Sequence, residues 1–380
     1  MDMKYLKYIC LSIILMMTAC IGNPGEEIDD NDPEPTIPDG FVLLPSANFF
    51  KADGNTMITF KVYSDKKDIT EDARIYQDLS SGAVRMETPE FKTTEAGTYT
   101  FFATYKGQTS EKVLIVATTG DFPPLPSDPQ PEKFNGFKHR LVATQFTGTG
   151  CGYCPNAISA IAKFKESEYA DKMLFAASHS YNGDDPMYCD DASSLARRMS
   201  ITAYPSVILN INPKNLLSSL SATGFYNYLV SGTEILLEED AHCGISASVS
   251  KNANTINLSA KVKVGETGSY RIVAWLLEDG IKATQANQVG IAVGNIHNNA
   301  LRSASMVDIA AGDYLGGKET VASGTEVEFR HEFNIDNVVN VDKCHVLVIV
   351  SRKTDEFRNH IADNAIDCPV DKSVAFEYDE

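Results

Sequence analysis

Apolar and polar side chains alternate along several short stretches in the first part of the chain. A period of two is that of a β-strand with one buried face. Residues 56–63 (TMITFKVY) alternate in this way, and residues 95–107 place a glycine turn before a run rich in β-forming side chains. About seven short strands fit between residues 41 and 118, so this part is predicted to be a small β-sandwich.

Alternation returns in the last part of the chain, from residue 241 to residue 380. Residues 256–264 (INLSAKVKV) and 327–333 (VEFRHEF) both follow the period of two. Trp275, the only tryptophan, stands in the middle of another apolar run and is expected in the core. These patterns predict a second, larger β-sandwich over residues 241–380.

Residues 138–240 mix the two periods and are predicted to form an α/β domain. Strand-like runs alternate with segments whose apolar residues recur at helical spacing, which is the pattern of an α/β fold. Residues 119–137 precede this part and hold five prolines between positions 123 and 131, so they are predicted to be a stiff linker. The expected strands are 141–146, 173–177 and 206–210, and the expected helical segments are 157–164, 193–199 and 216–238.

The N-terminus carries the pattern of an export signal. Lys4 and Lys7 precede an apolar run of about ten residues, which is too short to span a membrane but fits a signal peptide. Residues 17–20 (MTAC) resemble a lipoprotein cleavage site, which implies a signal peptide over residues 1–19 and a lipid on Cys20. The alternative is a soluble secreted protein cut after Ala19.

Residues 20–40 are acidic, rich in proline and glycine, and nearly free of apolar side chains. Such a segment buries too little surface to fold and is predicted to be a flexible tether. It resembles the surface-export signal of lipoproteins from the Bacteroides group, which implies exposure at the cell surface. The periplasmic face of the outer membrane remains the alternative.

The net charge of the chain is −18, which argues against nucleic acid as a partner and against charge-driven binding to anionic lipid headgroups. Membrane attachment is therefore expected through the lipid on Cys20 alone. No sequence pattern calls for a cofactor, and none is expected.

Cys151 and Cys154 stand two residues apart in the stretch TGTGCGYCPNAI and are the main candidates for chemistry. A thiol at a helix N-terminus has a lowered pKa, so Cys151 is expected to be the exposed attacking thiolate and Cys154 the resolving thiol. A zinc site would need distant ligands such as His179 or Cys189. A permanent structural disulfide is the third interpretation, and the sequence leaves all three open.

The strand, glycine turn, CGYC stretch and later Tyr204–Pro205 together resemble a thioredoxin-like domain. The resemblance implies a cis proline at position 205 and a Tyr204 backbone that faces a substrate chain. Two positions depart from it: Gly150 stands where an aromatic is usual, and Gln145 where a buried acid helps move a proton. Residues 96–107 (AGTYTFFATYKG) similarly resemble late strands of immunoglobulin-like (Ig-like) domains. The predicted fold is thus an Ig-like β-sandwich, a central thioredoxin-like domain and a C-terminal β-sandwich.

Residues 138–380 also resemble a family of Bacteroides-group lipoproteins related to outer membrane protein 28. The resemblance rests on FTGTGCGYCP (146–155), AASHSYNGDDPM (176–187), AYPSVILN (203–210) and IHNNALRSA (296–304). His179 and Asp185 invite a catalytic interpretation, although a strand-end histidine held by loop backbone is the simpler one. Arg302 is expected to pair with a nearby carboxylate.

The cysteines outside the CGYC stretch could form structural disulfides in an exported protein. Cys189, Cys243, Cys344 and Cys368 allow three pairings. A bond between Cys344 and Cys368 is the preferred one, because one begins a predicted strand and the other ends the next segment.

Two functions follow from these patterns. The first is thiol–disulfide exchange on exported proteins or peptides, carried out by Cys151 and Cys154. The second is a non-catalytic surface binding or adhesion protein that uses the thioredoxin-like domain as a scaffold between β-modules.

Overall fold

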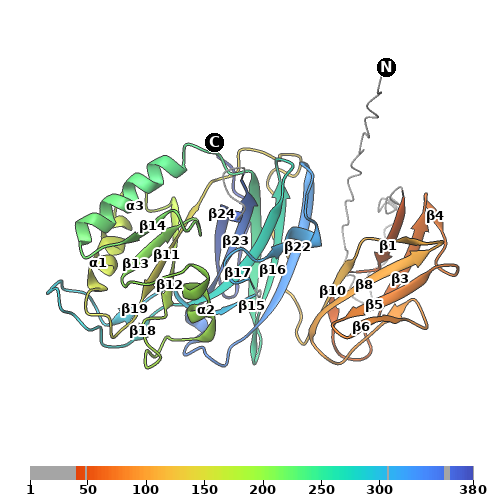
Figure 1. Ribbon diagram of the computed structural model, residues 1–380, viewed down its shortest axis with the longest axis horizontal. Coiled ribbons are helices and arrows are strands. Elements are labelled where there is room, and N and C mark those ends of the chain that lie inside the picture. The colour runs from red at the N-terminus through yellow and green to blue at the C-terminus, as the bar shows by residue number, and fades with distance from the viewer. Residues whose placement is uncertain (1–39, 48, 306–307, 355–359, 380) are drawn as a thin grey trace, which may run out of the picture. The chain divides into compact units, whose positions relative to one another are not determined.

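The computed structural model describes residues 40–47, 49–305, 308–354 and 360–379 (Figure 1). The predicted signal peptide, the lipidation site Cys20 and most of the acidic tether lie outside these residues. The chain divides into two compact units, residues 1–119 and 120–380, and the division falls beside the predicted end of the first sandwich. No helix in the described part is long and apolar enough to cross a membrane.

The first unit is a sandwich of two β-sheets. One sheet has the order β1-β3-β4 with β7 against β3, and the other has the order β2-β10-β8-β5-β6 with β9 against β8. Phe60 of one sheet meets Phe101 of the other at 4.8 Å between ring centroids, so the core lies between the sheets. The strands are β1 (Phe41–Pro45), β2 (Phe49–Lys51), β3 (Ile58–Ser64), β4 (Lys67–Asp68), β5 (Arg74–Leu79), β6 (Gly82–Arg85), β7 (Glu90–Phe91), β8 (Gly97–Tyr105), β9 (Gln108–Thr109) and β10 (Val113–Thr118).

The first half of the second unit is an α/β arrangement, as its mixed periodicity predicts. The four strands have the order β14-β13-β11-β12, in which β11 and β12 are parallel while β13 and β14 are antiparallel to their neighbours. The elements are β11 (Leu141–Thr147), α1 (Pro155–Phe164), β12 (Met173–His179), α2 (Asp190–Arg198), β13 (Ser206–Leu209), β14 (Leu216–Ser218) and α3 (Ala222–Leu236). The helix predicted from residue 216 thus begins later, after a short edge strand.

The second half of the unit is nearly all β-structure. Its long strands are β15 (Cys243–Lys251), β16 (Thr255–Val264), β17 (Tyr270–Glu278), β20 (Ala300–Ala304), β22 (Thr325–Asn334), β23 (Cys344–Lys353) and β24 (His360–Pro369). The short elements are β18 (Ile281–Lys282), β19 (Ile296–His297), β21 (Asp313–Tyr314), η1 (Leu315–Gly317), η2 (Val341–Lys343) and β25 (Lys372–Val374).

One nine-stranded sheet runs through both halves of this unit. Its order is β14-β13-β11-β12-β20-β17-β23-β24, with β21 also paired to β17. The two halves meet where β12 pairs with β20, at Ala177 and Ala300. The predicted domains 138–240 and 241–380 therefore share a sheet and form one compact unit. Ala177 and Ala300 are more than a hundred residues apart in the sequence, so the local periodicity could not predict that they pair.

Three large buried clusters pack against this sheet. Helices α1 and α3 cover one face of β11, β12 and β13, and helix α2 packs in a second cluster on the other face. A third cluster fills the space between β17, β23 and β24 and the four-stranded sheet β22-β16-β15-β25, which completes a C-terminal sandwich. Trp275 of β17 belongs to the second cluster and is fully buried, as predicted.

The predicted proline-rich linker packs against the second unit. Its carbonyl oxygens at Asp121 and Pro123 accept hydrogen bonds from Asn257 and Ser259 of β16. Its Asp128 carboxylate lies 2.7 Å from the Nζ of Lys263, whose side chain has no exposed surface. Residues 120–137 are thus a strap on the four-stranded sheet rather than a free spacer, because β16 presents side-chain donors to carbonyls that proline-rich backbone leaves unpaired.

Candidate functional site

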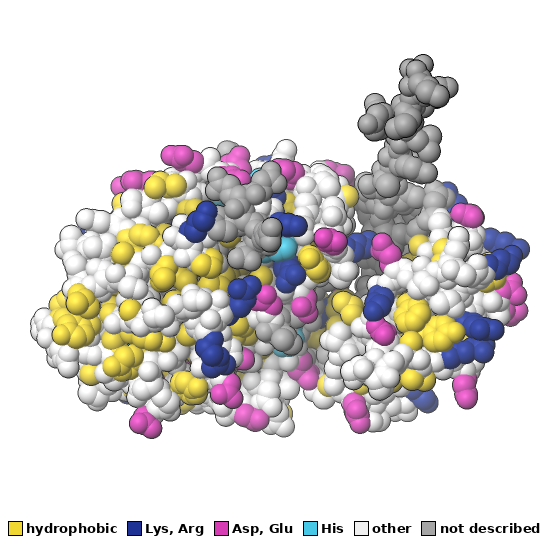
Figure 2. All heavy atoms as spheres, in the orientation of Figure 1, with side chains coloured by type: hydrophobic (Ala, Val, Ile, Leu, Met, Phe, Trp, Pro, Cys, Tyr) yellow, Lys and Arg dark blue, Asp and Glu magenta, His cyan; other side chains and the backbone are white. Residues whose placement is uncertain are grey.

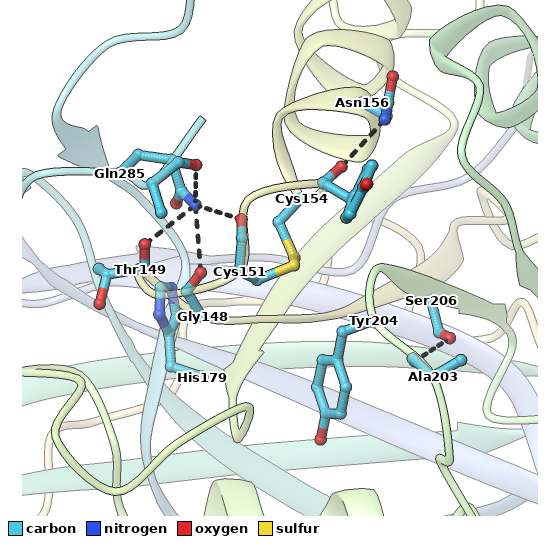
Figure 3. Close-up of a disulfide and its surroundings, with 12 residues drawn as sticks. Gly148, Thr149, Cys151, Cys154, Asn156, His179, Ala203, Tyr204, Ser206 and Gln285 are labelled. Carbon is cyan, nitrogen blue, oxygen red and sulfur yellow. Dashed lines mark hydrogen bonds between the residues drawn. A yellow bond between two sulfur atoms is a disulfide. The ribbon is translucent and has the colours of Figure 1, made fainter. Parts of the chain in front are cut away.

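The two cysteines form a disulfide at the start of helix α1 (Figure 3). Strand β11 ends at Thr147, and the chain then turns tightly: the Cys151 N–H donates to the Gly148 oxygen at 3.1 Å, and the Cys154 N–H to the Cys151 oxygen at 3.2 Å. Cys154 is the N-cap of the helix, and Pro155 occupies its first position, where a missing N–H costs no hydrogen bond. The disulfide therefore lies near the positive end of the helix dipole.

The proline predicted to be cis has a cis peptide bond with Tyr204. Tyr204 lies in the surroundings of the disulfide (Figure 3), and its hydroxyl bonds to the Ser180 side-chain oxygen at 3.0 Å. Its ring meets that of Tyr181 edge to face at 5.4 Å. The two tyrosines and the disulfide thus come from three separate segments that the fold brings into one region.

Both sulfur-bearing residues are buried, which corrects the expectation of an exposed Cys151. The exposed fraction is 3% for Cys151 and 0% for Cys154. The residues that cover the turn come from the loop between β18 and β19. The Ala286 N–H donates to the Thr149 oxygen at 2.7 Å, and the Gln288 N–H to the Gly152 oxygen at 2.8 Å. Sequence reasoning missed this loop, because residues 283–295 show no periodicity, motif or titratable side chain.

A buried pair of polar side chains, His179 and Asp185, is hydrogen-bonded to the turn between β11 and α1. The Nδ1 of His179 lies 2.9 Å from the Asp185 Oδ2, and the same oxygen accepts the Thr149 N–H at 2.6 Å. The other carboxylate oxygen accepts the Met187 N–H at 2.9 Å. The ring of His179 also meets that of His297 edge to face at 5.4 Å. The pair thus holds loop backbone next to the cysteines, which is the simpler of the two interpretations of His179 and Asp185.

The charge of Asp185 is stabilised by these contacts. Burial alone would raise the pKa of its carboxyl, but the hydrogen bond and charge of His179 and the two backbone donors lower the pKa to about 2. The nearby His297 has a lowered pKa because burial, and then the charge of His179, disfavour its protonated form.

Replacing Asp185 by asparagine should lower the free energy of unfolding by about 2 kcal/mol at pH 7. A carboxyl whose pKa is depressed from 3.8 to about 2 stabilises the fold above pH 3.8, and that contribution disappears as the pH falls through 2. Urea unfolding of both proteins at pH 7, 4 and 2 measures the effect. A difference that stays constant down to pH 2 would show that the carboxylate charge is not the cause.

The predicted bond between Cys344 and Cys368 is absent, and both are free buried thiols. Cys368 of β24 lies opposite Val346 in the register of β23, so the two thiols are offset by two residues along the strands. Cys189 and Cys243 are likewise buried and free. Cys189 is instead the N-cap of α2, where its sulfur accepts the Ala192 N–H.

Arg302 pairs with a carboxylate, as predicted. Its Nε lies 3.4 Å from the Glu278 Oε2, and both side chains are buried. Glu278 also accepts backbone N–H groups of Val339 and Asn340. The pair therefore serves to tie β17, β20 and the 337–340 loop together.

The side chains that commonly bind metal ions are not grouped around the disulfide or elsewhere in the described residues. No group of three or more His, Cys, Asp or Glu side chains in the described ranges is placed to hold an ion. The two sulfurs of the CGYC stretch are bonded to each other and hold no free thiolate.

Gln145 is buried in β11, at the position where the thioredoxin resemblance would place an acid, and its amide supplies no titratable proton.

Comparisons with known proteins connect the chain to the outer membrane. The model of the family described as "Outer membrane protein Omp28" matches residues 192–366, somewhat less than half of the chain. Among solved structures, HBP35 of Porphyromonas gingivalis is 20% identical, with a TM-score of 0.51 over 65% of this chain and 80% of that one. No curated protein matches the chain.

Two further structures are less similar. A protein from Agrobacterium tumefaciens is 13% identical, with a TM-score of 0.38 over 60% of this chain and 93% of its own. A domain of the outer membrane lipoprotein Omp28 from Porphyromonas gingivalis is 12% identical, with a TM-score of 0.24 over 34% of this chain and 89% of its own. The family match supports an Omp28-related chain located at the outer membrane, and the likeness to HBP35 shows a shared fold alone.

Proposed function

We propose that this protein is a lipid-anchored outer-membrane protein that carries a thioredoxin-like domain at the cell surface. In this proposal Cys20 carries the lipid, residues 20–40 form the tether, and Cys151 and Cys154 exchange their disulfide with thiols of exported proteins or peptides.

The observation that carries the proposal is the position of the disulfide in its sheet. The strand order β14-β13-β11-β12, with only β11 and β12 parallel, is the order expected of a thioredoxin-like fold. The disulfide follows the central strand β11 and precedes the first helix. Helices α1 and α3 on one face and α2 on the other complete the expected arrangement.

The proposed exchange begins with the Cys151–Cys154 disulfide intact. A partner thiolate attacks the Cys151 sulfur, a mixed disulfide forms, and Cys154 leaves as a thiolate near the positive end of the α1 dipole. A second partner thiol then displaces Cys151. The partner dithiol is thereby oxidised to a disulfide, and Cys151 and Cys154 are reduced to thiols.

Insulin reduction tests the same exchange in the reverse direction: dithiothreitol reduces Cys151 and Cys154, and the Cys151 thiolate then attacks an insulin disulfide while Cys154 resolves the mixed disulfide. We expect the protein to accelerate the reaction and Cys151→Ser to return it to the uncatalysed rate. The matched control is Cys189→Ser, because serine is a good N-cap and Cys189 caps α2 without taking part in the disulfide. Equal rates for wild type and Cys151→Ser would exclude the exchange.

A non-catalytic surface binding protein is the second candidate, and the distribution of apolar side chains favours it. Apolar side chains gather over the part of the larger unit that carries α1 and α3 (Figure 2). Exposed apolar side chains that lie together can form a contact surface for a partner. The exposed large side chains between residues 153 and 296 are Tyr153, Tyr181, Leu216, Leu220, Ile235 and Ile296. Under this function wild type and Cys151→Ser reduce insulin at equal rates. The purified protein would nevertheless bind a partner at the cell surface.

A further inference from the structure

A single loop, residues 283–295, packs on the turn that carries the disulfide, and we call it the covering segment. It joins β18 to β19 and is closed at its base, where the Ala283 N–H donates to the Asn295 oxygen at 3.0 Å and the Gln285 N–H to the Asn295 side chain at 3.2 Å. Its far end is held by its own Asn287, whose amide donates to the Ile291 oxygen at 2.7 Å. The segment is thus a self-contained loop attached at one end.

The covering segment lies on the disulfide turn through its backbone. Ala286 and Gln288 donate to the Thr149 and Gly152 oxygens, so donors two residues apart meet acceptors on either side of Cys151. These two bonds hold the backbone of the segment against the backbone of the turn. The segment therefore occupies the carbonyl oxygens of Thr149 and Gly152, next to Cys151.

The side chain of Gln285 fixes the segment to the turn. Its Nε2 lies 2.9 Å from the Cys151 oxygen, 3.2 Å from the Gly148 oxygen and 3.3 Å from the Thr149 oxygen, and Figure 3 shows the amide directed at all three. Only the nitrogen of the amide can face three carbonyls, and a carboxylate or a shorter side chain could not replace it. The side chain is 7% exposed, so these contacts are shielded from water.

The fit leaves no room for a larger residue at Gly152. A Cβ at this position would lie 2.6 Å from the Gln288 Cγ and 2.7 Å from its Cδ. The three nearest atoms all belong to the Gln288 side chain, so a methyl group would push on the covering segment.

We infer that the covering segment is a lid that keeps external thiols from the Cys151–Cys154 disulfide, with Gln285 as the residue that holds it closed. A regulatory role for the lid rests on the proposed exchange. The shielding of the disulfide from external thiols does not depend on that exchange. Opening breaks the Gln285 contacts and the two backbone hydrogen bonds to the turn, while the bonds at the base and tip of the segment are made by its own residues. Access to the sulfurs is thus set by a local motion.

The test measures how fast dithiothreitol reduces the disulfide in the full chain. Dithiothreitol closes to its cyclic disulfide as Cys151 and Cys154 become thiols, and alkylation followed by mass spectrometry counts the new thiols. We expect Gln285→Ala and Gly152→Ala to be reduced about five- to tenfold faster than wild type, which is the effect of losing one net hydrogen bond. The matched control is Gln108→Ala on the exposed strand β9, which should react at the wild-type rate.

Alkylation of the buried Cys189 in the same samples separates lid opening from unfolding. In wild type the disulfide should be reduced faster than Cys189 is alkylated; equal rates would mean that global unfolding controls access and would overturn the inference. Wild-type rates in both lid variants would also overturn it. Variants that are reduced faster yet do not reduce insulin would leave the lid intact as a conclusion and remove the proposed exchange.

Discussion

Replacing Trp275 by alanine should lower the free energy of unfolding of the larger unit by about 3–5 kcal/mol. The indole has no exposed surface, and its Nε1–H donates to the Ile309 oxygen at 2.8 Å. Truncation would leave a large cavity and an unpaired buried carbonyl, and both costs add. For a unit of this size the melting temperature should fall by roughly 10 °C.

The same variant tests whether residues 138–380 unfold together. The cluster around Trp275 contains Phe146 of β11 and Leu195 of α2 as well as Leu347 of β23, so it draws on both halves of the unit. Far-ultraviolet circular dichroism should therefore show the helices and the sheet melting in one transition at the lowered temperature. The control Leu220→Ala, at a residue 66% exposed, should change stability by less than about 0.5 kcal/mol. Helices that survive after the sheet melts would show two separate domains.

The local elements of this unit follow from the sequence because their causes are local. Apolar residues at helical spacing predict a helix over 157–164, and α1 spans Pro155–Phe164. The alternation at 256–264 predicts a strand, and β16 spans Thr255–Val264. The helix predicted from residue 216 was wrong at its start because the cause there is not local. The two adjacent leucines at 216 and 217 fit a strand or a helix, and pairing with β13 makes them a strand.

The joining of the two halves could not be predicted in this way. The pairing of Ala177 with Ala300 depends on contacts between distant segments, and neither alanine carries a pattern that names its partner. The strap over residues 120–137 is a similar case, because proline content predicts a stiff chain but not the surface on which it lies.

Part of the candidate site could be predicted from the local sequence and part could not. The CGYC stretch and Pro205 are recognisable because their chemistry needs those residue types at that spacing. The Cys151 backbone oxygen is bound by Gln285, a neutral side chain more than a hundred residues away in a loop without periodicity. Nothing in the local sequence distinguishes this glutamine from an exposed one.

Replacing Lys263 by methionine should destabilise the larger unit by about 3–5 kcal/mol and release the strap. The ammonium lies 2.7 Å from both the Asp128 carboxylate and the Pro131 oxygen, and 3.2 Å from the Gln130 oxygen. It also lies 4.3 Å from the centre of the Phe134 ring, where a cation is attracted to the aromatic face. Methionine fills a similar volume without any donor, so the partners lose their hydrogen bonds inside a water-poor site.

The cost should arise mainly from Asp128, and a second substitution can show this. The pKa of this carboxyl is lowered: burial would raise it, but the hydrogen bond and charge of Lys263 outweigh that effect. Without the lysine the partly buried Asp128 carboxylate loses its counter-charge, so the double variant Lys263→Met with Asp128→Asn should recover part of the lost stability. Urea unfolding measures the stabilities, and limited proteolysis between residues 120 and 137 measures release of the strap. A double variant no more stable than Lys263→Met would assign the cost to the lost carbonyl and aromatic contacts instead of the unpaired charge.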